Sequence, residues 1–504
     1  MSAITEAASV LLTRGPGSQE VFVVRRAEPL RFFGGFFAFP GGKVDPADAA
    51  LLPASPRRAS AARELFEETG VLLARDPGGS FPVAGADLRY LRRALIEGRL
   101  SFGEILKQLG LTLRADDLTF VGTLVTPPFA SFRFDTAFFV AELPAGQEAE
   151  VWPGELDEGR WTTAEALLAC WTRFECLVSP PTLSILEAIR GRPVAEAPAR
   201  LAPLLAALEG GAIPPIFFAP AVQMIPLRTL ALPPSTHTNA YLIGRDPAYL
   251  LDPGPSDADE QQRLFDVLDG HRAAGGRLTA VVLTHHHPDH IGAANACARR
   301  YDVPVWAHPL TARALSGRVP VARDIRDGDR LDLGTAPDGS GPWHLEAVYT
   351  PGHASGHLAF YEPHYRLLFV ADMVSTLSSI VIAPPDGDLT VYLESLWRLR
   401  GYEARLLLPA HGSPSPRPQQ IIDEALAHRQ KREEQLLAAL ASGPRQVAEL
   451  APELYPGLPE PLRRFAELQV LAGLQKLQRE GRVETAGGEG WRLRDPAPIK
   501  ERPD

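Results

Sequence analysis

One short stretch of the sequence, VVLTHHHPDHIG, constrains the fold more than any other feature. An apolar run typical of a β-strand leads directly into His285, His287, Asp289 and His290, so these residues are expected on the loop at the end of the strand. Imidazole and carboxylate groups at such fixed offsets can converge on a metal ion. The motif therefore predicts an α/β scaffold with a metal site at one edge of its sheet.

Three further residues follow β-like runs in the same way: His353 in TPGHASGH, Asp372 at the end of LFVAD, and His411 in LLLPAHG. With the first motif they resemble the ligands of the metallo-β-lactamase superfamily, whose members have an αββα sandwich with a two-metal site. The resemblance covers about residues 224–418. It implies one metal on His285, His287 and His353, a second on Asp289, His290 and His411, and Asp372 as a bridge.

The donor set also indicates which metals to expect. Imidazoles with a few carboxylates suit zinc, with iron or manganese as alternatives. Two such ions about 3.5–4 Å apart would give a hydroxide nucleophile at neutral pH, and Asp289 is expected to take part in this catalysis. His286 and His357 lie beside ligand positions, so we expect them to support ligands or to lie at the surface.

A second motif lies in FPGGKVDPADAALLPASPRRASAARELFEETGVLLA. Glu64, Glu67 and Glu68 are spaced i, i+3 and i+4, which places three mutually repelling carboxylates on one face of a helix. A hard cation would offset this repulsion, and Mg²⁺ or Mn²⁺ is the natural choice for carboxylate and phosphate oxygens. An ordinary charged helix face is the alternative interpretation.

This stretch resembles the Nudix box. The matching residues are Gly41, Gly42, Arg63, Glu64, Leu65, Glu67, Glu68, Gly70 and Val71. The resemblance implies metals on Glu67 and Glu68, Glu64 as ligand or base, and Arg63 as the partner that orients a carboxylate. The sequence departs from the box at Asp48, where glutamate is expected, and in a 14-residue spacer before Arg63, so a role for Asp48 is in doubt.

Other segments, FFGGFFAFPGG, TPPFASFRFDTAFF and SPPT, are similar to the Nudix branch that includes peroxisomal coenzyme A diphosphatases. The resemblance implies cleavage of the diphosphate of a nucleotide-linked substrate such as coenzyme A or an acyl-coenzyme A. Glu155 and Glu158 in GELDEGRW could add a ligand, although an ion-paired loop is the favoured interpretation.

The chain has 504 residues, more than one hydrophobic core accommodates, which predicts a multidomain α/β protein. We expect a Nudix α/β/α sandwich over residues 1–192, a Pro- and Ala-rich linker over 193–220, and a metallo-β-lactamase αββα sandwich over 221–418. Helices are expected around 59–74, 87–109 and 179–190. A winged-helix module is expected over 421–495.

The C-terminal module resembles the winged helix that follows the metallo-β-lactamase domain in a group containing an endoribonuclease of single-stranded RNA and thioesterase-like relatives. A nucleic-acid-reading module is usually basic, whereas the charges of this segment nearly balance. Its sequence therefore favours a role in packing, pocket closure or dimerisation over RNA binding.

Composition narrows the function further. The net charge of −10 argues against an extended surface for nucleic acid or anionic membranes. Three cysteines cannot form a disulfide framework, and no export segment or membrane-length apolar run is found, so we expect a soluble cytoplasmic protein. A β-lactamase of exported type is accordingly disfavoured.

Three functional hypotheses follow. The first is a bifunctional hydrolase of small molecules, in which one site splits a diphosphate and the dinuclear site hydrolyses an ester or thioester. The second is a single-stranded RNA endoribonuclease with an accessory Nudix domain, since two-metal chemistry serves phosphodiesters equally. The third makes one domain, preferably the Nudix domain, a non-catalytic binding module.

Overall fold

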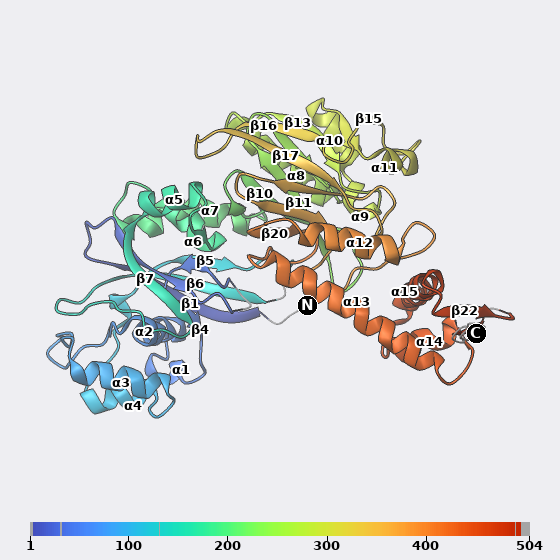
Figure 1. Ribbon diagram of the computed structural model, residues 1–504. Helices are drawn as coiled ribbons and strands as arrows, with labels where there is room; N and C mark the ends of the chain where they lie inside the picture. The colour runs from blue at the N-terminus through green and yellow to red at the C-terminus, as the bar shows by residue number, and fades with distance from the viewer. Residues whose placement is uncertain (1–3, 31–32, 131, 489, 495–504) are drawn as a thin grey trace, which may run out of the picture. The chain divides into compact units, whose positions relative to one another are not determined.

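The computed structural model describes residues 4–30, 33–130, 132–488 and 490–494. The chain divides into two compact units, one made mainly of residues 1–226 and the other of most of residues 227–504 (Figure 1). No helix among the described residues is both long enough and apolar enough to cross a lipid bilayer. Each unit is described by itself below.

The N-terminal unit is built on one eight-stranded sheet with the order β5-β6-β1-β2-β3-β8, in which β4 also pairs with β1 and β7 with β2. Its strands are β1 (Ile4–Thr13), β2 (Glu20–Arg26), β3 (Phe36–Ala38), β4 (Gly41–Lys43), β5 (Thr119–Val125), β6 (Arg133–Glu142), β7 (Leu156–Thr163) and β8 (Leu177–Val178). The central strand β1 runs parallel to β6 and antiparallel to β2. The long strands β1 and β6 thus form the rigid middle of the sheet.

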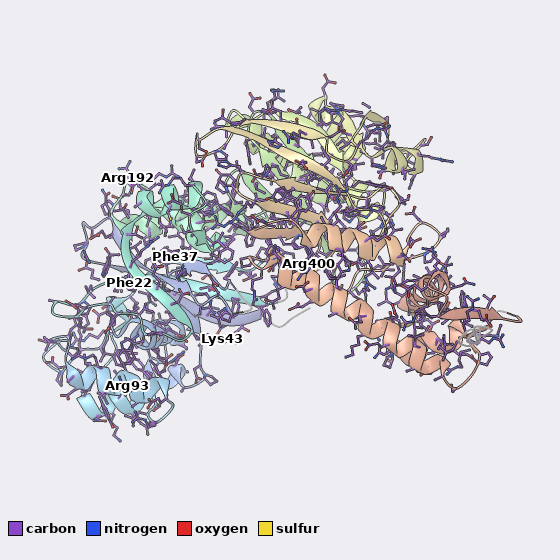
Figure 2. All side chains as sticks on the ribbon, in the orientation of Figure 1. Phe22, Phe37, Lys43, Arg93, Arg192 and Arg400 are labelled. Atoms are coloured by element: carbon purple, nitrogen blue, oxygen red, sulfur yellow. The ribbon has the colours of Figure 1, made fainter. Side chains whose placement is uncertain are left out.

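Alternation along β1 divides the buried residues between two cores. Val10 and Leu12 belong to one hydrophobic cluster and Leu11 to another, as the two-residue period of a strand requires. Phe22 and Phe37 likewise belong to different clusters; both are labelled in Figure 2. Helices cover both faces, so the unit has the predicted α/β/α layering.

The helices of this unit are α1 (Asp48–Leu51), α2 (Pro56–Thr69), α3 (Ala86–Ile96), α4 (Phe102–Leu109), α5 (Ala164–Thr172), α6 (Pro180–Ala188) and α7 (Ala197–Glu209). The continuous helix expected over 87–109 was wrong. The chain breaks into α3 and α4 because Gly98 has a left-handed backbone and Ser101 begins a new helix with a capping box to Glu104. Helix α2 ends earlier than expected because Gly70 is left-handed, with φ of 76°.

The segment expected to be a linker is more ordered than its proline content indicates. Pro198 lies in the first turn of α7, where a missing N–H costs nothing, and Pro203 lies inside the helix. Ala197 and Leu201 are buried in the cluster that also contains residues of α5 and α6. Most of residues 193–209 therefore packs into the N-terminal unit, and β9 (Ile216–Ala219) follows after a short loop.

Two further sheets follow along the chain, and their strands from β11 onward lie mainly in the second unit. The first has the order β15-β14-β13-β12-β11-β10-β9, and the second has the order β16-β17-β18-β19-β20. The further strands are β10 (Val222–Arg228), β11 (His237–Gly244), β12 (Ala248–Leu251), β13 (Leu278–Leu283), β14 (Val305–Ala307), β15 (Val321–Asp324), β16 (Arg330–Thr335), β17 (Pro342–Tyr349), β18 (Leu358–Glu362), β19 (Leu367–Ala371) and β20 (Leu406–Pro409). The helices are α8 (Ala258–Ala273), α9 (Pro288–Ile291), α10 (Ala294–Tyr301), α11 (Pro309–Ala314) and α12 (Leu389–Arg400).

The C-terminal module consists of α13 (Pro418–Leu440), α14 (Val447–Leu454), α15 (Glu460–Arg479) and a small sheet of β21 (Arg445–Gln446), β23 (Gly490–Leu493) and β22 (Val483–Ala486). Helix α13 serves two cores. Ile422 near its start packs with residues of β17–β20 and α12, whereas Leu436 and Leu440 near its end pack with α14 and α15. One helix thus joins the second sheet to the C-terminal module without a flexible break.

Candidate metal centres

The candidate ligands of the second unit lie where strands end. Strand β13 ends just before His285, β19 ends at Ala371 immediately before Asp372, and β20 ends at Pro409, shortly before His411. Strands β19 and β20 are parallel, so their carboxyl ends meet at the same edge of the sheet. His353 comes from the loop after β17. Four separate chain segments therefore converge on one place.

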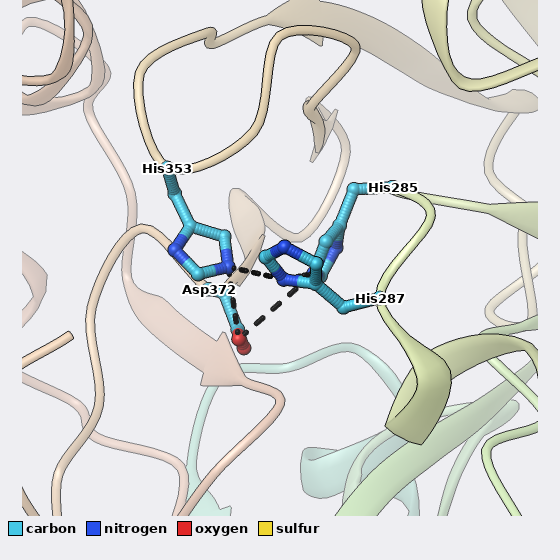
Figure 3. A group of neighbouring side chains, drawn as sticks. All are labelled: His285, His287, His353 and Asp372. Carbon is cyan, nitrogen blue, oxygen red and sulfur yellow. Dashed lines mark hydrogen bonds and ion pairs between the residues drawn. The ribbon is translucent and has the colours of Figure 1, made fainter. Parts of the chain in front are cut away.

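The first group consists of His285, His287, His353 and Asp372, shown in Figure 3. The Nε2 atoms of His285 and His353 lie 3.0 and 2.9 Å from Nδ1 of His287. Oδ2 of Asp372 lies 3.4 Å from His353 Nε2 and 4.0 Å from His285 Nε2. A tetrahedral zinc site with bonds of about 2.0–2.1 Å separates its donor atoms by about 3.3 Å. The spacing therefore suits one tetrahedral ion.

The second group consists of Asp289, His290 and His411. Oδ2 of Asp289 lies 3.4 Å from His411 Nε2 and 3.8 Å from His290 Nε2. The other carboxylate oxygen of Asp372, Oδ1, lies 3.3 Å from His411 Nε2 and 3.5 Å from His290 Nε2. Asp372 thus presents one oxygen to each group, as a bridging ligand would.

Two buried polar atoms at this point have no hydrogen-bond partner, Nε2 of His290 and Oδ1 of Asp372. Buried polar atoms are seldom left without a partner in folded proteins. Both atoms belong to the ligand set just described, and a cation between them would satisfy both. The residues therefore fit a pair of metal ions.

The two groups differ in charge. Burial lowers the pKa of His287 to about 3, and His353 beside it adds to this effect. Burial and the neighbouring His290 and His287 hold the pKa of His285 well below its usual value. These imidazoles are consequently neutral at pH 7, which is the form that binds metal.

Carboxylates dominate the second group. Burial alone would lower the pKa of His411, yet Asp372 and Asp289 raise it to about 10. Burial likewise opposes protonation of His290, but Asp372, Asp289 and Asp252 raise its pKa well above the usual value. Without a cation, protonated imidazoles therefore balance the carboxylates, and metal binding would displace these protons.

Asp252, which sequence reasoning missed, orients a ligand of the second group. It follows β12 directly, and its Oδ2 lies 2.9 Å from Nδ1 of His290. The same carboxylate accepts hydrogen bonds from the backbone N–H and the hydroxyl of Thr284, at 2.8 and 2.7 Å. The signal was a β-like run ending in aspartate, AYLLD, which shares the strand-end position of the candidate ligands. A carboxylate behind a histidine fixes its ring and raises its basicity.

Backbone carbonyl groups orient two other imidazoles. Nδ1 of His411 lies 3.0 Å from the carbonyl oxygen of His237, and Nδ1 of His353 lies 2.8 Å from that of Val381. When each Nδ1 donates to its carbonyl, Nε2 is left to face the metal centre. These partners are main-chain atoms, so no side-chain pattern could reveal them.

The C-terminal helices hold the segment that contains Val381. Arg429 of α13 donates a hydrogen bond to the carbonyl of Ile380, and Oε1 of Gln469 of α15 accepts one from the N–H of Ile382. The two residues flanking the carbonyl that orients His353 are thus fixed by the C-terminal module. Packing is one of the roles that the near-balanced charge of the C-terminal module favours.

His357 and His286 differ in environment. His357 is fully buried; its Nδ1 lies 2.9 Å from Thr350 Oγ1, and its Nε2 accepts from the backbone N–H of Asp372 at 3.3 Å. It therefore supports the bridging carboxylate from behind. His286 is only partly buried, with Nε2 3.7 Å from Asp386. His286, His287 and Asp386 form a third group of metal-ligand type.

In the N-terminal unit, Glu64, Glu67 and Glu68 lie on α2, whose opposite face buries Leu65 and Phe66. Their oxygens do not all lie within 4.8 Å of one another among the described residues, unlike those of the histidine groups. Arg63 separates them, since its Nη1 lies 2.9 Å from Glu64 and 3.2 Å from Glu67. The structure thus shows a carboxylate face held by one arginine.

Burial disfavours the charged form of two carboxyl groups on this face. It raises the pKa of Glu64 to about 7 and that of Glu68 to about 8, and nearby carboxylates add to both shifts. Glu68 accepts a hydrogen bond of 2.8 Å from the N–H of Gly41. A Cβ atom on Gly42 would lie only 2.4 Å from the Glu64 carboxyl group, so the glycine permits close approach of the loop. A divalent cation would offset both the burial and the repulsion that raise these pKa values.

Asp48 has a definite structural role. It is 1% exposed and pairs with Arg63 through two bonds, Nε to Oδ1 at 2.9 Å and Nη2 to Oδ2 at 3.0 Å. The spacer forms α1 and the start of α2, which return the aspartate to the arginine. Glu158 is ion-paired as expected, with its Oε2 3.6 Å from Nε of Arg25, but it lies in β7 and not in a loop. Glu155 is close enough to raise the pKa of Glu67.

Comparison with known families agrees with this geometry. Three family descriptions match the chain in order: NUDIX domain over residues 4–89, Metallo-beta-lactamase superfamily over 234–411, and Beta-lactamase associated winged helix domain over 447–491. The predicted multidomain α/β architecture is confirmed. The chain therefore contains a NUDIX domain, a metallo-β-lactamase domain and a winged helix, and the first two domains indicate a hydrolase.

Individual relatives match parts of the chain. An atrochrysone carboxyl ACP thioesterase from Aspergillus fumigatus is 26% identical over 49% of this chain and 77% of that protein. A hydroxyacylglutathione hydrolase from Rhizobium meliloti is 31% identical over 24% of this chain and 42% of that enzyme. The crystal structure of a NUDIX hydrolase from Alicyclobacillus acidocaldarius is 32% identical over 39% of this chain and 95% of that chain, with a TM-score of 0.35.

Proposed function

We propose that the chain is a bifunctional hydrolase of small molecules whose metallo-β-lactamase centre hydrolyses a thioester or a related ester. The observation that carries this proposal is Asp372, which directs one oxygen to each of two groups of metal-ligand type. Two ions, zinc by preference, would supply a hydroxide nucleophile at neutral pH. Two of the named relatives support the class of substrate, since one is described as an ACP thioesterase and the other as a hydroxyacylglutathione hydrolase.

In this proposal the side chains have distinct tasks. The metal ligands are His285, His287 and His353 for one ion, Asp289, His290 and His411 for the other, and Asp372 for both. Asp252 and the carbonyls of Val381 and His237 fix the rings of ligands, which lowers the cost of assembling the site. Asp289 also accepts a hydrogen bond of 3.3 Å from Thr238, which holds it in place at the edge of the centre.

The NUDIX domain is proposed to cleave the diphosphate of a nucleotide-linked substrate, of which coenzyme A and acyl-coenzyme A are the first candidates. Glu67 and Glu68 would hold Mg²⁺ or Mn²⁺, which neutralises phosphate charge, and Glu64 would be a ligand or a base. Water would attack one phosphorus and break its bond to the bridging oxygen. Arg63 would position Glu64 and Glu67 through the ion pairs described above.

A purely binding role for the NUDIX domain is less well supported. All three carboxylates of α2 are retained, and the buried pair of Asp48 and Arg63 keeps their face ordered despite the unusual spacer. A domain that only binds would not need buried carboxylates with raised pKa values.

The test is mass spectrometry of the products formed when the full chain, supplied with Mg²⁺ and Zn²⁺, is incubated with an acyl-coenzyme A. Free acid plus coenzyme A is expected from the metallo-β-lactamase centre, and 3′,5′-ADP plus acyl-phosphopantetheine from the NUDIX centre. If neither product pair formed with acyl-coenzyme A, acylglutathione or other nucleoside diphosphate derivatives, the proposal would be wrong. Cleavage of single-stranded RNA under the same conditions would favour the endoribonuclease hypothesis.

A further inference from the structure

A cavity of about 300 Å³ lies beside the metallo-β-lactamase centre. One wall is the loop that follows Asp372, from Val374 to Ile380, and another is the helix α13. The hydroxyl group of Ser375, on this wall, donates a hydrogen bond of 3.2 Å to the carbonyl of the candidate ligand His411. One residue of the cavity wall therefore contacts the backbone of a candidate ligand, and the cavity volume is at the lower end of the usual range for a small-molecule site.

Arg429 is a buried arginine among the residues that line this cavity. Only 5% of it is exposed, and its contacts are with uncharged groups, the carbonyl of Ile380 and the ring of Tyr392, whose centroid lies 5.1 Å from the guanidinium. No carboxylate of the described part of the chain lies within ion-pair distance of it. Arginine is seldom buried without a counter-ion because desolvating its charge is costly. The structure thus holds a buried positive charge that an anion could balance.

The other cavity residues suit an anion as well. Ser378 and Ser379 place hydroxyl groups along the loop, whereas the hydroxyl groups of Ser375 and Thr376 donate to the carbonyls of His411 and Ser413. Burial and the nearby Arg429, Arg432 and Lys431 lower the pKa of His428 to about 4, so that this imidazole is neutral at pH 7. Glu424 is the one acidic residue of the lining; it is exposed, and it accepts a hydrogen bond from Gln420. The charge deep in the cavity is accordingly that of Arg429.

We propose that this cavity binds an anionic group, a phosphate or a carboxylate, on the carrier half of the thioester, with Arg429 as its cation. The inference rests on the proposed thioester hydrolysis and adds how the substrate is recognised. The carrier's anion would lie in the cavity while the thioester reaches the metal centre. Arg429 would then have two tasks, since it also fixes Ile380 near the carbonyl that orients His353.

The experiment compares three thioesters that share one acyl group. Acyl-coenzyme A carries phosphates, acylglutathione carries carboxylates, and acyl-N-acetylcysteamine carries no charge. For Arg429→Gln we expect kcat/KM to fall about 10- to 100-fold more for the preferred charged thioester than for the neutral one, the usual range for a lost charged hydrogen bond. Arg429→Lys, which keeps the charge, should retain most of the preference. Which charged substrate shows the loss identifies phosphate or carboxylate as the ligand.

Two control variants separate recognition from positioning. Gln469→Leu removes the hydrogen bond to Ile382 without changing charge, so it should lower kcat/KM for all three thioesters equally. Lys431→Gln removes an exposed positive charge two residues from Arg429 and should leave the preference unchanged. Thermal melting shows whether each variant is folded.

The outcomes are distinguishable. If Arg429→Gln lowered kcat/KM equally for all three substrates, as Gln469→Leu is expected to do, Arg429 would be a positioning residue and the anion site would be wrong. The same conclusion would follow if the unmodified enzyme hydrolysed the neutral thioester as efficiently as both charged ones. If the enzyme hydrolysed none of the three, the proposed thioester hydrolysis would fail, and this inference with it.

Discussion

The two candidate metal centres are built in opposite ways. The carboxylates of the NUDIX centre lie within five consecutive positions of one helix, Glu64 to Glu68. The seven candidate ligands of the metallo-β-lactamase centre come from four segments spread from His285 to His411. The first arrangement depends on helical periodicity, whereas the second depends on two sheets that bring strand ends together. A local pattern can therefore define one site, but only a complete fold can define the other.

The two centres also differ in how they carry charge without metal. The carboxylate face has one arginine, Arg63, among several acids, and burial keeps the pKa values of Glu64 and Glu68 high. The other centre balances Asp289 and Asp372 with His290 and His411. Hard oxygen ligands favour Mg²⁺ or Mn²⁺, and imidazole favours zinc. One chain thus offers two environments that should select different ions.

The largest effect is expected from substitutions that each inactivate one of the two centres. Asp372→Asn should lower thioester hydrolysis by about 10³-fold or more, because it removes charge from both ion positions, and should leave diphosphate cleavage unchanged. Glu67→Gln should lower diphosphate cleavage and should leave thioester hydrolysis unchanged. Steady-state rates of both reactions in each purified variant provide the measurement. A variant that lost both activities would show that the centres are not independent.

Metal exchange provides the next largest effect. Dialysis against a strong chelator should abolish both activities, after which Mg²⁺ alone should restore diphosphate cleavage and Zn²⁺ should restore thioester hydrolysis. Elemental analysis of the reconstituted protein should find about two zinc ions per chain. Recovery of thioester hydrolysis with Mg²⁺ alone would contradict the assignment of the histidine centre.

A smaller effect is expected from Asp252, which contacts a candidate ligand but is not itself one. Asp252→Asn keeps the shape of the side chain but removes the charge that orients His290, and it should weaken zinc binding or activity about 10- to 100-fold. Competition with a fluorescent zinc chelator measures the affinity. Asp246→Asn, a change of the same kind at an exposed residue paired with Arg277, is the matched control and should change nothing. An Asp252→Asn protein with unaltered affinity would exclude the orienting role.

The smallest effect concerns pH and the stability of the NUDIX domain. Glu68 has a folded-state pKa of about 8, above its unfolded value of 4.5, so its favourable contribution is complete below about pH 4.5 and is lost as the pH rises through about 8. The melting temperature of the metal-free domain should thus fall by a few degrees between pH 6 and pH 9. Glu68→Gln, which can still accept from Gly41, should reduce this fall, and so should Mg²⁺. Calorimetry at pH 6 and pH 9 measures the melting temperature. If neither Glu68→Gln nor Mg²⁺ reduced its fall, Glu68 would not be the cause.

Sequence reasoning succeeded where a residue's position follows from local pattern. The strand-end motifs predicted that His285, His353, Asp372 and His411 would come together, and the structure places them together. The α/β architecture with a terminal winged helix is confirmed as well. Apolar runs marked the strands, whereas the grouping of the candidate ligands and the winged helix were implied by the resemblance to the metallo-β-lactamase superfamily and its relatives.

The missed features depend on contacts between distant segments. Asp252 reaches His290 only because β12 and β13 are adjacent parallel strands. Gln469 acts on the backbone of Ile382, 87 residues earlier, and no side-chain pattern records such a contact. The ion pair between Asp48 and Arg63 forms only because residues 49–62 fold so that the two side chains meet. The break between α3 and α4 was missed because the cap at Ser101 lay within an otherwise helical stretch.

The spread of the second centre along the chain has a consequence during synthesis. The carboxylate helix is complete by residue 69, early in translation, whereas the ligand His411 and the supporting Gln469 are added much later. At about 5–20 residues per second, more than ten seconds separate these events on the ribosome. If both proposed centres bind metal, the carboxylate helix is in place before the candidate ligands of the second centre are all synthesised. A cell that limits free zinc would protect this interval, in which His285, His287 and His290 could bind an ion in the wrong geometry.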